Sequence, residues 1–77
     1  MPKYAIPIDL QKQLDNAYTY HAPKEDQPER YVTIRSAAHD FAMIICQNAP
    51  QSRERAIGLT LLEEVVCMVN KAIACNE

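Results

Sequence analysis

The fold is decided by the stretch S-R-E-R-A-I-G-L-T-L-L-E-E-V-V-C-M-V-N-K-A-I-A-C-N, residues 52–76. It predicts one long helix with two apolar faces, because two series of apolar side chains repeat at alternating steps of three and four. The first face comprises Leu59, Leu62, Val66, Val69 and Ile73, and the second comprises Leu61, Val65, Met68, Ala72 and Cys75. A single neighbouring helix needs an apolar arc of only about 100°. The second face therefore predicts contact with another copy of the protein, and so an oligomer.

A second long helix is predicted upstream as the internal partner of the first. Pro28 suits the first turn of a helix, with Asp26 or Gln27 as its cap. The apolar side of this helix is expected to comprise Tyr31, Ile34, Ala38, Phe41, Ile45 and Asn48. The helix should end before Pro50, since the residue preceding a proline avoids helical backbone angles, and Ser52 then caps the next helix. So short a link predicts an antiparallel αα-hairpin.

Prolines divide the chain upstream of the hairpin. Residues 1–7 contain two prolines and are expected to be extended or flexible. Residues 8–17 predict a short helix, too short to be stable alone in water, which must pack on something else. Residues 18–28 form a proline-containing connector. The predicted fold is all-α: one domain of residues 1–77 with a short N-terminal helix followed by a long antiparallel helical hairpin.

Composition supports helices and limits the possible partners. The chain has 77 residues, 48% apolar, with one glycine and no tryptophan, which favours helices over strands. A net charge of −2 argues against binding of DNA or RNA polymers, but a small anionic ligand needs only a few well-placed arginines. No signal peptide and no apolar run near the ~18 residues of a membrane span are present. We therefore expect a cytoplasmic protein with no membrane partner.

The odd number of cysteines predicts free thiols. Cys46, Cys67 and Cys75 all fall in helical patterns, and reduced, buried, small apolar side chains are their expected role. Zinc is the alternative, with His21 and His39 as further ligands, but no C-x-x-C or H-x-x-x-H spacing supports it. We expect neither a metal nor another cofactor.

Motifs of enzymes are absent from the sequence. There is no glycine-rich phosphate loop, no G-x-S-x-G and no H-E-x-x-H. The adjacent carboxylates of Glu63 and Glu64 point about 100° apart on a helix, which is typical of a solvated face rather than of an acid–base pair. The protein is therefore not expected to be an enzyme.

Two clusters have the composition of a binding site. The first surrounds the junction of the connector and the second helix, and comprises Tyr18, Tyr20, His21, Lys24, Arg30, Tyr31 and Arg35. Aromatic rings beside guanidinium groups suit stacked bases and phosphates; the alternative is that Tyr20 packs on the hairpin and Arg35 is a solvated helix residue. The second cluster, residues 52–55, could bind an anion at a helix start, or could be an ordinary capped helix start.

Scattered motifs connect these clusters to a known family. They are Y-H-x-P at residues 20–23, Q-x-x-x-Y-x-x-I-R at 27–35, P-x-S-R-E at 50–54, L-T at 59–60, L-E-E at 62–64 and N-x-A-I-A at 70–74. The pattern resembles that of small phage helical-hairpin proteins that sequester cyclic oligonucleotide signals. These are the anti-CBASS sponges, which are related to the hairpin of anti-Thoeris sponges. The resemblance covers roughly residues 18–77.

The resemblance implies an assembly and two kinds of site. Family members form hexamers that bind cyclic dinucleotides between protomers, through a tyrosine and a basic residue fifteen positions later; Tyr20 and Arg35 match that pair. His21, Lys24 and Tyr31 are expected beside them. Some members also hold cyclic trinucleotides in separate sites near the start of the last helix. The residues that fall there in this chain are Arg53, Gly58 and Thr60.

The function implied is that of a sponge. The protein would bind cyclic dinucleotides, and also trinucleotides as some members of the family do, without cleaving them. It would thereby block anti-phage signalling in the host bacterial cytoplasm if it is phage-encoded. The alternative is a helical protein–protein interaction or regulatory module, similar to an antitoxin, which uses the second apolar face for a protein partner. A nucleotide-degrading enzyme would require a metal site or a general base that the sequence does not display.

Overall fold

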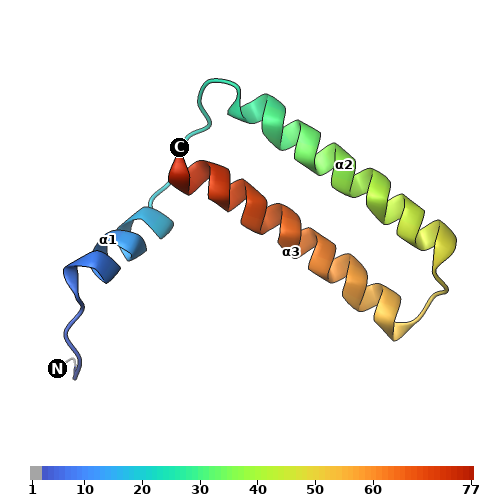
Figure 1. Ribbon diagram of the computed structural model, residues 1–77, viewed down its shortest axis with the longest axis horizontal. Coiled ribbons are helices and arrows are strands. Elements are labelled where there is room, and N and C mark those ends of the chain that lie inside the picture. The colour runs from blue at the N-terminus through green and yellow to red at the C-terminus, as the bar shows by residue number, and fades with distance from the viewer. Residues whose placement is uncertain (1–2) are drawn as a thin grey trace.

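The computed structural model describes residues 3–77 of the chain. These residues form three helices, α1 (Ile8–Ala17), α2 (Gln27–Asn48) and α3 (Arg53–Asn76), and no strand. The two long helices, α2 and α3, run side by side in opposite directions, and α1 extends away from the end of the hairpin where α3 finishes (Figure 1). The predicted all-α class is therefore confirmed for the described residues. The expected flexible segment, residues 1–7, begins outside them, and its described part is not helical.

The turn between the long helices is closed by its own side chains. Ser52 is the N-cap of α3, and its hydroxyl oxygen accepts a hydrogen bond from the Arg55 backbone N–H at 3.1 Å. The Arg55 side chain reaches back and donates from Nη1 to the Ala49 carbonyl oxygen at 3.1 Å. A cation at the carboxyl end of α2 satisfies carbonyl groups that have no partner inside the helix. Arg55 therefore stabilises the hairpin turn instead of facing a ligand.

The inner face of the hairpin is lined by half-buried side chains. They are Tyr31, Ile34, Ala38, Ala42 and Ile45 from α2, and Leu59, Leu62, Val66 and Ile73 from α3. Val69 lies at the edge of this face and is more exposed than the others. The first apolar face of the last helix thus packs on α2, largely as the periodicity predicts.

Two residues of α2 do not lie where the sequence predicts. Phe41 is 54% exposed and Asn48 is exposed, whereas Ala42 and Ala49 are half-buried in their place. Consecutive helical residues are turned by about 100°, so Phe41 and Ala42 cannot both point at α3. Small side chains at Ala38 and Ala42, which are four residues apart and on one face, allow α3 to approach closely.

Residues 3–77 of the single chain form no fully buried hydrophobic core. No apolar side chain among the described residues is fully buried, and Leu61, Val65 and Met68 on the second face of α3 are exposed. The accessible surface of 6552 Å² exceeds the roughly 4,700 Å² typical of a folded 8.7 kDa protein by about 1,800 Å². The radius of gyration is 17.4 Å, against about 11.5 Å for a compact chain of this length. Hence the hairpin alone leaves apolar surface for another partner to cover.

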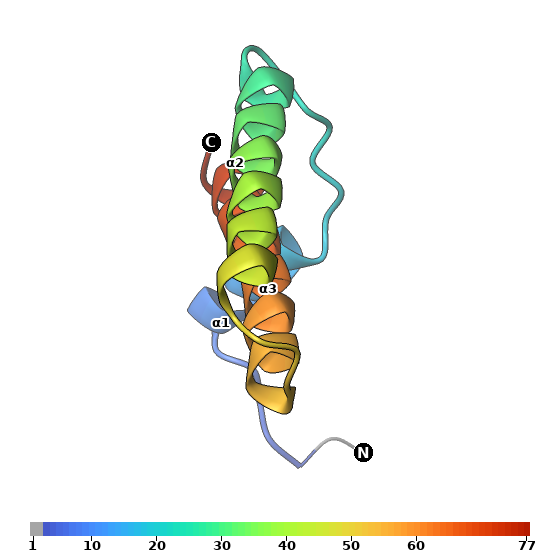
Figure 2. The same ribbon diagram turned by 90° about the vertical axis from the view of Figure 1, so that its right-hand side faces the viewer.

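The molecule is flat, with extents of 51 × 36 × 14 Å, and Figure 2 shows its narrow side.

Cys46 and Cys67 are exposed and Cys75 is half-buried, so the expectation of buried cysteines is wrong for the first two in the single chain. Both exposed thiols lie on the long helices, where a one-layer hairpin can cover only the inner face. No helix in the described part of the chain is both long enough and apolar enough to cross a membrane.

Candidate functional site

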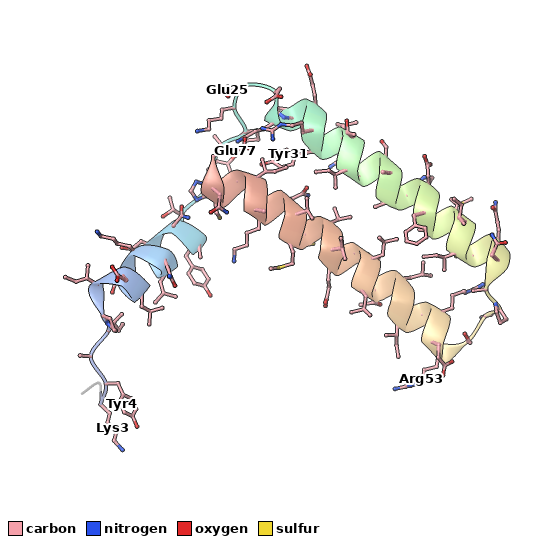
Figure 3. The ribbon with its side chains drawn as sticks, viewed as in Figure 1. Lys3, Tyr4, Glu25, Tyr31, Arg53 and Glu77 are labelled. Carbon is pink, nitrogen blue, oxygen red and sulfur yellow. The ribbon has the colours of Figure 1, made fainter. Side chains whose placement is uncertain are left out.

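The open end of the hairpin, where the connector meets the end of α3, contains a hollow of about 550 Å³. Its lining comes from the end of α1, the connector, the first residue of α2 and the end of α3, and comprises Asn16, Tyr20, His21, Ala22, Lys24, Gln27, Ala74, Cys75, Asn76 and Glu77. Figure 3 shows Glu25, Tyr31 and Glu77 at this end of the molecule, and Arg53 at the opposite end. The hollow brings together three of the residues that the sequence predicts for a dinucleotide site.

Those three residues, Tyr20, His21 and Lys24, differ in how they are held. Tyr20 is 84% exposed, so the alternative reading in which it packs on the hairpin is wrong for the single chain. The His21 ring donates from Nε2 to the Asn16 carbonyl oxygen at 2.8 Å. The Lys24 ammonium donates to the main-chain oxygen of Glu77 at 2.8 Å. An aromatic ring is thus free to contact a ligand, while the two basic side chains anchor the connector.

The carboxylate of Glu77 is the centre of the polar contacts at this end. It accepts a bidentate pair of hydrogen bonds from the Arg30 guanidinium, of which Nη1 to Oε2 measures 2.8 Å, and another from Gln27 Nε2 at 3.1 Å. Arg30, and after it Gln27, lower the pKa of Glu77 from its ordinary 4.5 to about 2. The hydrogen bond to Glu77 in turn raises the pKa of Arg30. The pair is therefore fully charged at neutral pH.

Arg35 lies at a different place. It borders a second hollow of about 660 Å³ on the hairpin, whose lining is mostly apolar: Arg35, Ala38, His39, Ala42, Met43, Cys46, Leu59, Leu62, Glu63, Val66 and Cys67. Arg35 is exposed and belongs to the rim of this groove, whereas Tyr20 belongs to the hollow at the open end. Within one chain the two residues therefore do not share a hollow.

Tyr31, the fifth residue predicted for the dinucleotide site, is half-buried on the inner face of the hairpin. Figure 3 shows its side chain between α2 and α3, near Glu77. In this position its ring packs the two long helices together. Like His21, it is less exposed than Tyr20, Lys24 and Arg35 in the single chain.

The predicted trinucleotide residues occupy the first two turns of α3. Arg53 and Thr60 are exposed and seven residues apart, which places them on one face of the helix. Gly58 is half-buried, about 140° around the helix from Arg53. A Cβ atom added at Gly58 would meet no atom within 4 Å. Packing within the single chain therefore does not require glycine at position 58. Because Gly58 lies on a different side of α3 from Arg53 and Thr60, the three residues of one chain cannot all face the same ligand.

The chemistry available at these places is that of binding. No group of three or more His, Cys, Asp or Glu side chains that could hold a metal ion occurs among residues 3–77. The two hollows are lined by the exposed aromatic ring of Tyr20, the exposed guanidinium of Arg35, and several amide and ammonium groups that can donate hydrogen bonds. These groups suit an anionic ligand with flat rings, such as a nucleotide.

The fold and these groups define a helical hairpin with the features of a small-anion binder. The sequence matches the family described as "Acb2/Tad1, hairpin domain" over residues 11–74. The chain therefore belongs to this family, the anti-CBASS and anti-Thoeris sponges, whose members are not catalytic. This match confirms the resemblance seen in the sequence. The comparisons with curated proteins and with solved structures found no match to the chain.

Sequence reasoning missed the contacts of Glu77 and Asn16. Asn16 donates from Nδ2 to the Cys75 carbonyl oxygen at 2.8 Å, joining residues that are 59 positions apart. Glu77 and Arg30 are 47 positions apart. No local pattern specifies such contacts. Of the polar contacts at this end of the hairpin, the spacing in the sequence indicates only the (i, i+4) ion pair of Asp26 and Arg30, which the structure forms at 3.2 Å.

Proposed function

We propose that the protein is a homo-oligomer that binds cyclic oligonucleotide messengers between its chains and sequesters them without cleaving them. Membership of the sponge family over residues 11–74 is the observation that carries this proposal. In infected bacteria, sequestration would lower the free messenger concentration and leave the effectors of anti-phage immunity inactive. A sponge of this kind needs affinity and an excess of sites, but no catalytic group.

The separation of Tyr20 from Arg35 supports a dinucleotide site built from two chains. A cyclic dinucleotide carries two phosphates and two bases related by approximate two-fold symmetry. On a two-fold axis, Tyr20 of one chain could stand beside Arg35 of the partner subunit, and each pair would meet half of the ligand. A guanidinium can hold a phosphate with paired N–H donors, and an exposed tyrosine can cover a base. His21, Lys24 and Tyr31 would complete the site.

The exposed apolar surface supports the assembly that this site requires. About 1,800 Å² of excess surface per chain is more than the ~800 Å² that each partner buries in a standard interface. Leu61, Val65 and Met68 are the apolar side chains expected at the interface on α3. We take the hexamer of the family as the form of the assembly.

A trinucleotide site is proposed by the same reasoning on a three-fold axis. Arg53 and Thr60 of one chain share a face, and Gly58 lies on another side of the helix. Such a site would therefore combine Arg53 and Thr60 of one chain with Gly58 of the next. An assembly with both kinds of axis could bind both classes of ligand without competition.

Incubation with a panel of cyclic di- and trinucleotides tests this proposal directly. The protein is separated from free ligand, then heat-denatured, and the released nucleotides are identified by mass. Depletion of a ligand followed by its intact recovery is the expected result. Recovery of a linear or shorter product would mean an enzyme. No depletion of any ligand would refute the sponge and favour the interaction module, for which the exposed apolar face of α3 would be the docking surface.

A further inference from the structure

The end of α3 is tied to the connector by a set of polar contacts, here named the clasp: Glu77 with Lys24, Gln27 and Arg30. The Glu77 carboxylate holds Arg30 and Gln27, and the main-chain oxygen of the same residue holds Lys24. A further pair, Asn16 to Cys75, ties the end of α1 to the same turn of α3 at 2.8 Å. The connector is thus fastened at both ends to the last turn of α3.

Main-chain contacts make the clasp part of the connector itself. The Lys24 backbone N–H donates to the Gln27 side-chain oxygen at 3.1 Å, and the Gln27 backbone N–H donates to the Lys24 carbonyl oxygen at 3.0 Å. Gln27 is only 3% exposed, the lowest value among the described residues. Without Glu77 its buried amide would lose an acceptor, which favours opening of the turn. Glu25, within this turn, has a positive φ of 54°, so the conformation depends on such contacts.

Tyr20 lies between the two fastened ends. It is 84% exposed, and its immediate neighbour His21 is bound to Asn16. The direction in which Tyr20 projects therefore follows from where Asn16 and Lys24 hold the connector. Lys24 uses one of its three ammonium donors in the clasp and keeps two for a ligand.

We propose that Glu77 is a positioning residue for nucleotide binding: by holding Lys24, Gln27 and Arg30, it fixes the connector in the conformation that presents Tyr20. This inference rests on the proposed function. A protein whose binding-competent conformation is only partly populated shows an affinity reduced by that fraction. If release of the clasp leaves about one tenth of the connectors competent, the dissociation constant rises about tenfold, chiefly through slower association.

The alternative is that Glu77 weakens ligand binding. Whether the affinity falls or rises when Glu77 is replaced separates this role from the positioning role. The carboxylate lies in the lining of the hollow, where it could compete with a ligand phosphate for Arg30. In that case loss of its charge would tighten binding. The participation of buried Gln27 and of the Lys24 backbone favours the positioning role, because a simple anion competitor would not need to order the turn.

The test compares Glu77→Ala, which removes both carboxylate oxygens that hold Arg30 and Gln27, with the wild type, using cyclic GMP–AMP as the probe. Glu64→Ala is the matched control, since it removes the same carboxylate from an exposed position on α3. We expect faster hydrogen exchange at the Lys24 and Gln27 amides, unchanged exchange in the middle of α2 and α3, and association with the probe about tenfold slower. Arg30→Lys, which keeps the charge but loses the bidentate geometry, should give a smaller effect in the same direction.

Several results would overturn the proposal. Unchanged exchange at the two amides, unchanged affinity despite faster exchange, or tighter binding by Glu77→Ala would each contradict positioning by the clasp. Equal weakening by Glu64→Ala would assign the effect to overall charge. If the wild type binds no cyclic nucleotide, the proposed function fails and the binding role of Glu77 fails with it. The exchange rates then still report whether Glu77 holds the connector.

Discussion

Removal of Tyr20 and Arg35 together is the sharpest test of where a cyclic dinucleotide binds. Both side chains are exposed in the single chain, and Tyr20 is 84% exposed, so truncation should cost the hairpin little stability. Arg35→Ala removes a charge-assisted phosphate contact of ~1.5–3 kcal/mol, and a symmetric site loses it twice. Tyr20→Ala removes base stacking of ~1–3 kcal/mol per base. Since about 1.4 kcal/mol is tenfold in affinity, losing these contacts in both halves of the site should weaken binding by at least ~100-fold for Arg35→Ala and by at least ~30-fold for Tyr20→Ala.

Isothermal titration calorimetry with cyclic GMP–AMP measures this loss, and the sequence offers matched controls. Tyr18 is 86% exposed and belongs to the same connector, but it does not line the hollow. Tyr18→Ala should therefore leave affinity nearly unchanged. Lys12→Ala removes a cation from α1 and controls for long-range attraction of an anionic ligand. Arg35→Lys should recover only part of the loss, because an ammonium cannot reproduce the paired donors of a guanidinium.

The result that refutes this assignment is binding of full strength by the Tyr20→Ala/Arg35→Ala variant. Oligomeric state and melting temperature must be measured on the same samples, because a collapsed assembly would also lose affinity. If Tyr18→Ala weakens binding as much as Tyr20→Ala, the connector contributes through its general aromatic character and not through one placed ring. Near-complete rescue by Arg35→Lys would count against the bidentate contact, but not against the site.

Three further predictions concern the assembly, the second site and the clasp. Val65→Lys or Met68→Lys should dissolve the oligomer to 8.7 kDa monomers in sedimentation analysis, because an unpaired charge in an apolar interface costs several kcal/mol; an oligomer of unchanged mass would remove this face from the interface. Thr60→Trp should abolish trinucleotide binding and spare dinucleotide binding in a competition assay, and equal loss of both would mean one shared site or a damaged fold. Glu77 should titrate with a midpoint near pH 2 by NMR of its carboxyl carbon, because Arg30 and Gln27 lower its pKa from 4.5. Its depressed pKa means that its stabilising contribution is complete above about pH 4.5 and is lost as the pH falls through about 2; a midpoint near 4.5 would show that the clasp is open in solution.

The local rules in the sequence predict the helices well. Pro28, Pro50 and Ser52 mark where the long helices start and stop, and the structure places α2 and α3 within a residue of the expected bounds. Phe41 shows where periodicity alone fails. Steps of three and four allow either Phe41 or Ala42 on the inner face, and hydropathy favours the larger side chain, whereas close packing of two helices favours the smaller one.

Contacts between distant segments could not be predicted from the sequence. The clasp depends on the length of α3 relative to α2, which brings Glu77 level with Arg30, and no local pattern encodes that match. Arg55 illustrates the same limit from the other end. The sequence groups it with Arg53 as a candidate anion site, but the turn directs its guanidinium to the Ala49 carbonyl oxygen.

The absence of a core in the single chain bears on how a sponge of this kind could work. Since no apolar side chain among residues 3–77 is fully buried, contacts between copies in the proposed oligomer would stabilise the hairpin. A ligand held between chains binds the assembled form and not the separate chains, so by linkage it stabilises the assembly, by about 2.7 kcal/mol at one hundred times its dissociation constant. In the proposed assembly, the ligand and the other copies would supply the stabilising contacts that the single chain lacks. Tyr20 and Arg35, which line separate hollows of one chain, would then be brought together by the same contacts that stabilise the proposed assembly.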